Sequence, residues 1–215
     1  MKLNLLLSIL VVPLFAAAFS GVDTSGGKEF FFRGTEYTKI YTKESGTPFL
    51  ETQGINTGWV DYYGSRYHDV TLQYDIEDDE LVSYDFSGTV RMQLVKQKIT
   101  AFGIGTRKFV RIAGTDLFFE EVYNGPHQVL IRRQKVFTRT GTEDGMYKLY
   151  TSYFVSHGKV PVNIQSGNDL FSYFGKYGKE LKEYLRDQKI VFKKNPEKAI
   201  ITVVSYADKI GWHGR

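Results

Sequence analysis

The sequence contains no cysteine. Disulfide bonds, cysteine nucleophiles and thiolate metal sites are therefore excluded, and so is a bacterial lipoprotein, which carries its lipid on a cysteine. Small exported domains commonly rely on disulfides, so the stability of this chain has to come from a packed core. Aromatic residues make up 15 % of its 215 residues, and each can bury a large apolar area. A conventional core is feasible on this composition.

Long apolar runs are missing after the first twenty residues. Those twenty residues combine a lysine at position 2 with an apolar run that ends in alanines, at 3–18, which is the pattern of a cleaved secretory signal. A membrane anchor is the alternative, but the run is shorter than the roughly twenty apolar residues that span a bilayer. We predict a signal peptide at residues 1–20, a mature chain that begins at Phe19 or Gly21, and no transmembrane segment after cleavage. The protein is then periplasmic or extracellular.

Neither sign of charge dominates, since 28 basic residues stand against 24 acidic ones. Proteins that bind nucleic acid concentrate lysine and arginine on one face. The densest basic stretch lies on a predicted strand, where successive side chains alternate between faces; its members are Arg132, Arg133, Lys135 and Arg139. We interpret this stretch as a solvated strand face and expect no nucleic-acid partner.

Compact catalytic motifs are also missing. The sequence has no H-E-x-x-H pair and no G-x-S-x-G elbow. Its four histidines are far apart, each in or beside a predicted turn, and we interpret them as surface turn residues: His68, His127, His157 and His213. We therefore predict no catalytic site, no metal site and no cofactor. A catalytic triad or carboxylate pair built from distant segments remains an alternative, because the sequence does not show which segments meet in the fold.

The first part of the mature chain has the pattern of a β-sheet domain. Apolar residues alternate with polar ones over 70–76, which is the period of a half-buried strand. Similar segments follow at short intervals, separated by glycine- and asparagine-containing turns. After a flexible leader at 21–28, we predict an antiparallel β domain at 29–165. It has about nine to eleven strands in a meander sheet that is sandwich-like or barrel-like.

The spacing of apolar residues changes at Ser166. Apolar side chains then recur at steps of three and four, as on one face of a helix. Ser166 or Asn168 can cap this helix, and two later glycines divide it into short helices. Another helix is favoured after Asn195, with a strand as the alternative. The predicted fold class is mainly β with an α-helical C-terminus (α+β), in which a segment at 166–215 with two or three short helices packs on the same domain.

Two local clusters are candidates for binding. The acidic run at 75–80 begins like a calcium loop but lacks the glycine and the final glutamate of one, so we interpret it as a solvated hairpin turn, with a weak cation site as the alternative. Four aromatic residues crowd a glycine-punctuated segment, and such rings can stack on sugars or proteins: Trp59, Tyr62, Tyr63 and Tyr67. They are the predicted ligand-binding patch, and packing in the core or at a sheet edge is the alternative.

Two stretches carry a resemblance to a known group of proteins. One is Tyr67 to Ile76 with Asp79 to Val82, and the other is Asp169 to Phe171 with Lys179 to Tyr184 and Ala199 to Ile201. In these stretches the chain resembles uncharacterised exported β-rich proteins of Bacteroidetes-type Gram-negative bacteria. The resemblance implies an envelope compartment and brings no activity or functional residue with it.

These observations favour one function class over two others. We expect a non-catalytic envelope protein that binds or scaffolds a protein, glycan or lipid partner. An exported hydrolase with dispersed catalytic residues is the alternative. An outer-membrane barrel is less favoured, because the strands are short and charged and the C-terminal segment is helical. The identity of the partner and the oligomeric state do not follow from the sequence.

Overall fold

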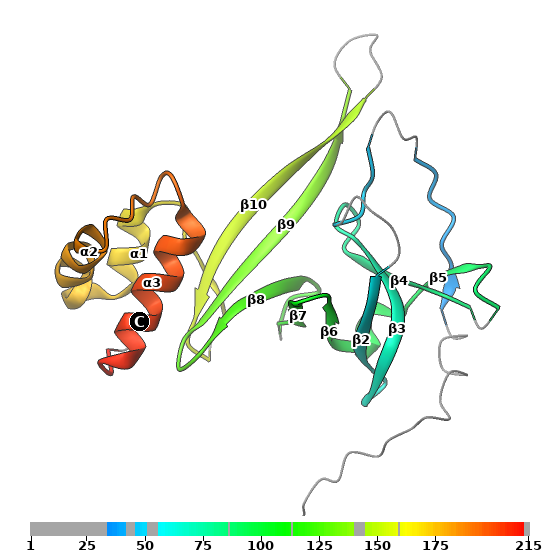
Figure 1. Ribbon diagram of the computed structural model, residues 1–215, viewed down its shortest axis with the longest axis horizontal. Coiled ribbons are helices and arrows are strands. Elements are labelled where there is room, and N and C mark those ends of the chain that lie inside the picture. Colours follow the sequence, from blue (N-terminus) through cyan, green and yellow to red (C-terminus); the bar gives the residue numbers. More distant parts are fainter. Residues whose placement is uncertain are drawn as a thin grey trace, which may run out of the picture.

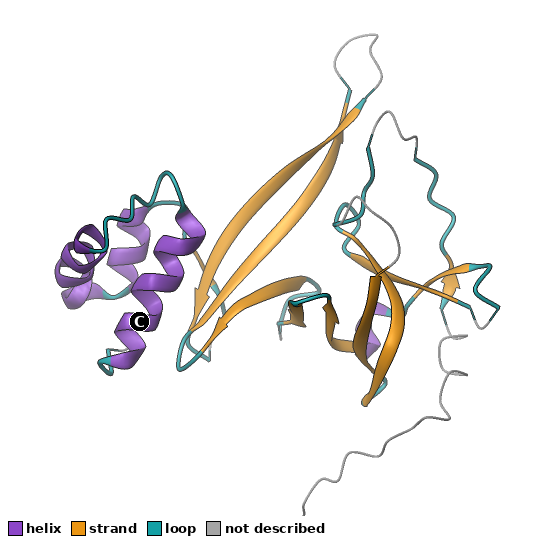
Figure 2. Ribbon diagram, viewed as in Figure 1, coloured by secondary structure: helices purple, strands orange, loops and turns teal. Residues whose placement is uncertain are grey.

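The computed structural model describes residues 34–41, 46–50, 56–85, 87–112, 114–139, 145–158 and 160–212. The signal peptide predicted at 1–20 and the leader predicted at 21–28 lie outside the described residues. Figures 1 and 2 show a curved sheet followed by a helical segment, with the first strands at one end of the molecule and the helices at the other. The predicted class, mainly β with a helical C-terminus, is confirmed.

The sheet has eleven strands among the described residues and is entirely antiparallel. They are β1 (Thr35–Glu36), β2 (Asn56–Tyr62), β3 (Ser65–Asp75), β4 (Glu80–Tyr84), β5 (Arg91–Gln93), β6 (Ile99–Ile104), β7 (Arg107–Arg111), β8 (Phe118–Asn124), β9 (Gln128–Thr138), β10 (Met146–Ser156) and β11 (Val162–Asn163). Their order across the sheet is β1-β5-β4-β3-β2-β6-β7-β8-β9-β10-β11. Because β6 pairs with β2 and not with β5, two meanders join in one unclosed sheet.

Alternation along the strands places one face of the sheet in a core. On β3, Val70, Leu72 and Tyr74 are buried as the sequence predicts. Strands β2 to β8 curve around a cluster in which Tyr74 touches two phenylalanine rings edge-on, Phe102 and Phe109, each at a centroid distance of 5.1 Å. This first core therefore lies within the curved sheet and contains no helix.

The helical segment forms a second core. It consists of α1 (Gly167–Tyr173), the 3-10 turn η3 (Gly175–Tyr177), α2 (Gly178–Asp187) and α3 (Pro196–Lys209). Its apolar faces cover Val129 of β9 and Val155 of β10. The two cores thus lie at opposite ends of the molecule, and β8 and β9 run between them (Figure 1).

Local sequence signals explain the helix boundaries. Ser166 caps α1 in a reciprocal pair with Asp169, and the Asn195 side chain accepts the Lys198 N–H at 3.1 Å at the start of α3. Gly175 has a φ of +55°, which a residue with a side chain rarely adopts, and it separates α1 from α2. The predicted helix after Asn195 is confirmed, and the strand alternative is wrong.

Candidate functional site

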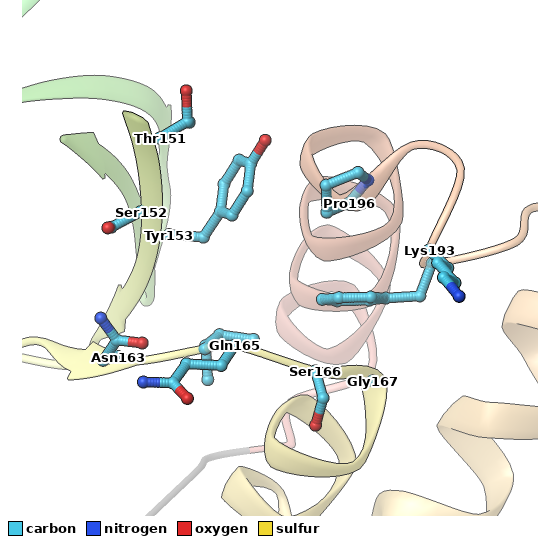
Figure 3. Close-up of a pocket in the computed structure, with 11 residues that line it drawn as sticks. Thr151, Ser152, Tyr153, Asn163, Gln165, Ser166, Gly167, Lys193 and Pro196 are labelled. Atoms are coloured by element: carbon cyan, nitrogen blue, oxygen red, sulfur yellow. The ribbon is translucent and has the colours of Figure 1, made fainter. Parts of the chain in front are cut away.

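A pocket of about 680 Å³ lies where the sheet meets the helical segment. Three stretches between residues 151 and 196 line it, and Figure 3 shows them in close-up. The lining residues are Thr151, Ser152, Tyr153, Asn163, Ile164, Gln165, Ser166, Gly167, Phe192, Lys193 and Pro196. A volume of this size falls within the range of pockets that bind small molecules or short chain segments.

Each wall of the pocket is held by a different element. The first wall is β10, whose side chains alternate, so that Thr151 and Tyr153 share a face. The second wall is the short link from β11 into α1, where the chain leaves the sheet at Ile164. The third wall is the connection between α2 and α3, which brings Phe192 and Pro196 opposite β10. The pocket therefore exists only while the helical segment is docked on the sheet.

Tyr153 has a central place in the pocket. Its ring lies between β10 and Pro196 at the start of α3 (Figure 3). Burial raises the pKa of the Tyr153 phenol, and the nearby carboxylate of Glu197 raises it further, whereas Arg133 lowers it. The phenol is neutral at physiological pH, so it can donate or accept a hydrogen bond while its ring face packs against a ligand.

The remaining lining is mostly neutral. Thr151, Asn163 and Gln165 offer hydroxyl and amide groups, and Phe192 offers an aromatic ring. The Ser166 hydroxyl is already engaged, because it donates to Asp169 Oδ2 at 2.9 Å and accepts the Asp169 N–H. These groups can hold a ligand by hydrogen bonds and ring stacking.

The structure divides the four residues of the predicted aromatic patch. Tyr62 and Tyr67 are core residues with exposed fractions of 0 % and 8 %, so their rings cannot face a ligand and the packing alternative holds for both. Tyr63 is half-buried against the same core, in a two-residue turn with Gly64 where both residues have positive φ. Trp59 is half-buried too, and the Arg66 guanidinium lies 4.3 Å from its ring centroid. Ligand binding at Trp59 and Tyr63 stays a prediction.

The indole of Trp59 packs against a glycine on the neighbouring strand. Trp59 pairs with Gly103 of β6, and a Cβ at Gly103 would stand only 2.1 Å from the indole Nε1. We expect Gly103→Ala to displace the indole and to lower the free energy of unfolding by about 1–3 kcal/mol. Urea unfolding and tryptophan fluorescence measure the two effects. Thr100→Ala, on an exposed position of the same strand, should change neither, and an unshifted spectrum for Gly103→Ala would contradict the packing.

The prediction that each histidine lies at the surface is wrong for His127. Its side chain is fully buried and pairs with Asp208 of α3, which also accepts the His127 backbone N–H at 3.1 Å. The His157 ring lies 4.6 Å from it, and its Nδ1 is 2.8 Å from the Pro126 carbonyl oxygen. Neither His127 nor Asp208 lines the pocket. The pair fastens the last turns of α3 to the turn between β8 and β9. His213 lies outside the described residues.

The acidic run also differs from its interpretation as a solvated turn. Asp75 is fully buried and accepts hydrogen bonds from the Tyr37 hydroxyl at 2.8 Å and from Lys39 Nζ at 3.2 Å. Asp79 is buried as well, accepts the Tyr74 hydroxyl and lies 2.8 Å from Lys96 Nζ. Asp75 and Asp79 are therefore structural acceptors, whereas Asp78 in the same run is exposed. In the part of the chain that the structure describes, no three His, Asp or Glu side chains gather in a way that could hold a metal ion.

The basic stretch is a solvated face only in part, because Arg139 is exposed whereas Arg133 and Lys135 are engaged. Arg133 contacts Glu120 on the neighbouring strand and reaches Glu197 Oε2 of α3 at 3.1 Å. Lys135 Nζ donates to the Thr47 carbonyl at 2.9 Å and to that of Phe49. These contacts join β9 to β8, to α3 and to the segment that precedes β2.

Within the described ranges, no helix is both long enough and apolar enough to cross a bilayer. No protein-family model, curated protein or solved structure matches this chain. The resemblance to exported Bacteroidetes-type proteins therefore stays a prediction.

The pocket residues were missed at the level of sequence. Tyr153 looked like an ordinary strand residue, and Phe192 stood in an unremarked loop. The one available signal was the capping pattern from Ser166 to Asp169, which marks where the chain leaves the sheet and so where a helix could meet β10.

Proposed function

We propose that this protein is an exported, non-catalytic binding protein whose site is the pocket between β10 and the helical segment. The observation that carries the proposal is the composition of the pocket wall, which combines aromatic and neutral hydrogen-bonding side chains. General acid–base chemistry most often uses an imidazole or a carboxylate placed beside the substrate. The described residues that line the pocket include neither, and its one cation, Lys193, points away from β10 (Figure 3).

Export is part of the proposal and is supported by the signal pattern at residues 1–20. Protein recovered from the periplasm or medium should then begin at Phe19 or Gly21 by N-terminal sequencing. Recovery of the intact N-terminus from the cytoplasm alone would contradict export.

The binding proposal is tested with a defined panel of short peptides, bacterial oligosaccharides and phospholipid vesicles, read by amide chemical shifts of the labelled protein. Binding should shift residues of β10, β11 and the α2–α3 connection. Asn163→Trp, which places a large ring at the pocket wall, should weaken that binding at least about tenfold, the loss of roughly 1.4 kcal/mol.

His68→Trp is the matched control, because His68 is also an exposed strand residue but lies on β3. It should leave binding unchanged. If no panel member shifts the pocket residues, or if the two variants weaken binding equally, the pocket is not the binding site.

A further inference from the structure

Strand β10 is paired on only one side for most of its length. From Met146 to Ser156 it pairs with β9 without a register shift. On its outer side, only Val162 and Asn163 of β11 pair with it, opposite Val155 and Phe154. Among the described residues, no strand lies on the outer side of 146–152 (Figure 1).

The outer edge presents backbone groups in a regular pattern. The Ile164 N–H donates to the Tyr153 carbonyl at 2.8 Å, which shows that the polar groups of Tyr153 point outward. In an antiparallel strand these groups alternate between the two sides. Tyr147, Leu149 and Thr151 therefore direct both N–H and C=O to the same outer edge, where they form a template for a further strand.

Devices that block strand addition are scarce along this edge. Natural edge strands are commonly protected by charges, prolines or bulges. Residues 146–152 contain one charge, Lys148, and no proline. Exposed apolar side chains occur instead, because Met146, Leu149 and Tyr150 are each more than half exposed. Among the described residues, the outer edge of β10 therefore offers another chain unpaired backbone groups and exposed apolar side chains.

The open edge leads directly into the pocket. Thr151 and Ser152 belong to the open edge and also line the pocket, and Tyr153, whose carbonyl already accepts the Ile164 N–H, lines it beside them. A strand laid along β10 would therefore have one end between β10 and α3. A pocket of about 680 Å³ holds a few residues of a single chain. A second copy of this protein would bring a two-stranded hairpin to the same place, which favours a single segment as the occupant.

We propose that the outer edge of β10 from Tyr147 to Thr151 binds an extended, uncharged segment of a partner polypeptide as an additional strand, with one end of the segment seated in the pocket. Backbone hydrogen bonds provide the affinity and alternate side chains provide the selectivity, as in other cases of strand addition. This inference rests on the proposed function and names its ligand class.

The test begins with hydrogen exchange in the free protein. The amides of Tyr147, Leu149 and Thr151 should exchange fast, whereas those of Lys148, Tyr150 and Ser152, which bond to β9, should exchange slowly. Slow, concentration-dependent exchange of the outward amides would show that a second copy already occupies the edge, and would overturn the proposal.

The probe is a peptide enriched from a phage-displayed library of random seven-residue sequences, synthesised with blocked ends. At saturation it should slow exchange of the three outward amides at least about tenfold, since each gains a hydrogen bond. N-methylation at the alternate peptide positions that face β10 should weaken binding at least about tenfold, and N-methylation at the other positions should leave it within about twofold. Failure to enrich a binder, or equal effects of the two methylation patterns, overturns the proposal.

Two protein variants separate backbone from side-chain effects. Leu149→Pro removes an outward N–H that β9 does not use, so it should abolish peptide binding, whereas Leu149→Ala keeps the N–H and should retain most of it. The N-methylated peptides give the same comparison with the unaltered protein if Leu149→Pro does not fold. Binding of an oligosaccharide in the pocket without protection of the β10 amides would overturn strand addition and leave the proposed function standing.

Discussion

Replacing Glu120 with Gln is expected to lower the free energy of unfolding by about 3 kcal/mol. Glu120 lies on β8 with an exposed fraction of 8 %. Arg107 of β7 donates two hydrogen bonds to it, at 2.9 and 2.8 Å, and Arg133 of β9 contacts the same carboxylate. One buried carboxylate thus pairs with two guanidinium groups. Removing one partner of a buried ion pair lowers the free energy of unfolding by roughly 3–5 kcal/mol. Urea unfolding monitored by circular dichroism measures the change.

Glu197→Gln is the matched control for this prediction. Glu197 is the outer carboxylate of the same network, at 3.1 Å from Arg133 Nη2, and its side chain is 38 % exposed. Exposed ion pairs contribute about 0–1 kcal/mol, so this variant should be only slightly less stable than the natural protein. Equal losses for the two variants would show that burial does not set the strength of this network.

The second large effect is expected at alkaline pH. Burial raises the pKa of several tyrosines in the folded state, and three of them have largely buried side chains: Tyr37, Tyr74 and Tyr173. The pKa of Tyr173 rises to about 12, and neighbouring carboxylates add to the rise at all three residues. In the unfolded chain these phenols titrate near pH 10. Between pH 10 and the pKa values of the folded state, only the unfolded chain loses these protons. The contribution of these phenols to the free energy of unfolding is therefore complete below pH 10 and is lost as the pH rises above it.

These three groups alone predict that the free energy of unfolding falls by at least about 4 kcal/mol per pH unit above pH 10. Urea unfolding at successive pH values gives the slope, and the ultraviolet absorbance of tyrosinate shows when ionisation occurs. Tyr173→Phe supplies the control. The buried Tyr173 hydroxyl has no hydrogen-bond partner among the described residues, so this variant should be about as stable at pH 7 and should reduce the slope by about 1.4 kcal/mol per unit. A stability that stays constant from pH 10 to 11 would contradict the prediction.

The sequence predicted those features that depend on neighbouring residues. Alternation on β3, the cap at Ser166 and the asparagine–proline start of α3 each arise within a few residues, and each was confirmed. Helix α3 formed despite the β-branched residues at 200–204 because its buried face completes the second core. Tertiary packing decided between two local preferences there.

The candidate site could not be predicted because it depends on how the helical segment packs against β10 and β11. The pocket walls come from 151–153, 163–167 and 192–196, and no spacing rule connects them. His127 was misjudged for a related reason. The asparagine–glycine–proline turn beside it indicates a surface position, yet Asp208, which lies 81 positions further along the chain, covers it. Aromatic residues at 59–67 suggested a patch, but strand alternation and the tight turn at Tyr63 send two of the four rings into the core.

The separation of the two cores has a consequence for the order of assembly during synthesis. Strands β2 to β8 contain all they need to close the first core by the time β9 is made. Val129 and Val155, in contrast, wait for α1 to α3, which are synthesised later. Until α3 is synthesised, Val129 and Val155 remain exposed to solvent, and the pocket beside β10 lacks the wall that the α2–α3 connection provides. We therefore expect a stage in which the first core has formed and the pocket beside β10 has not.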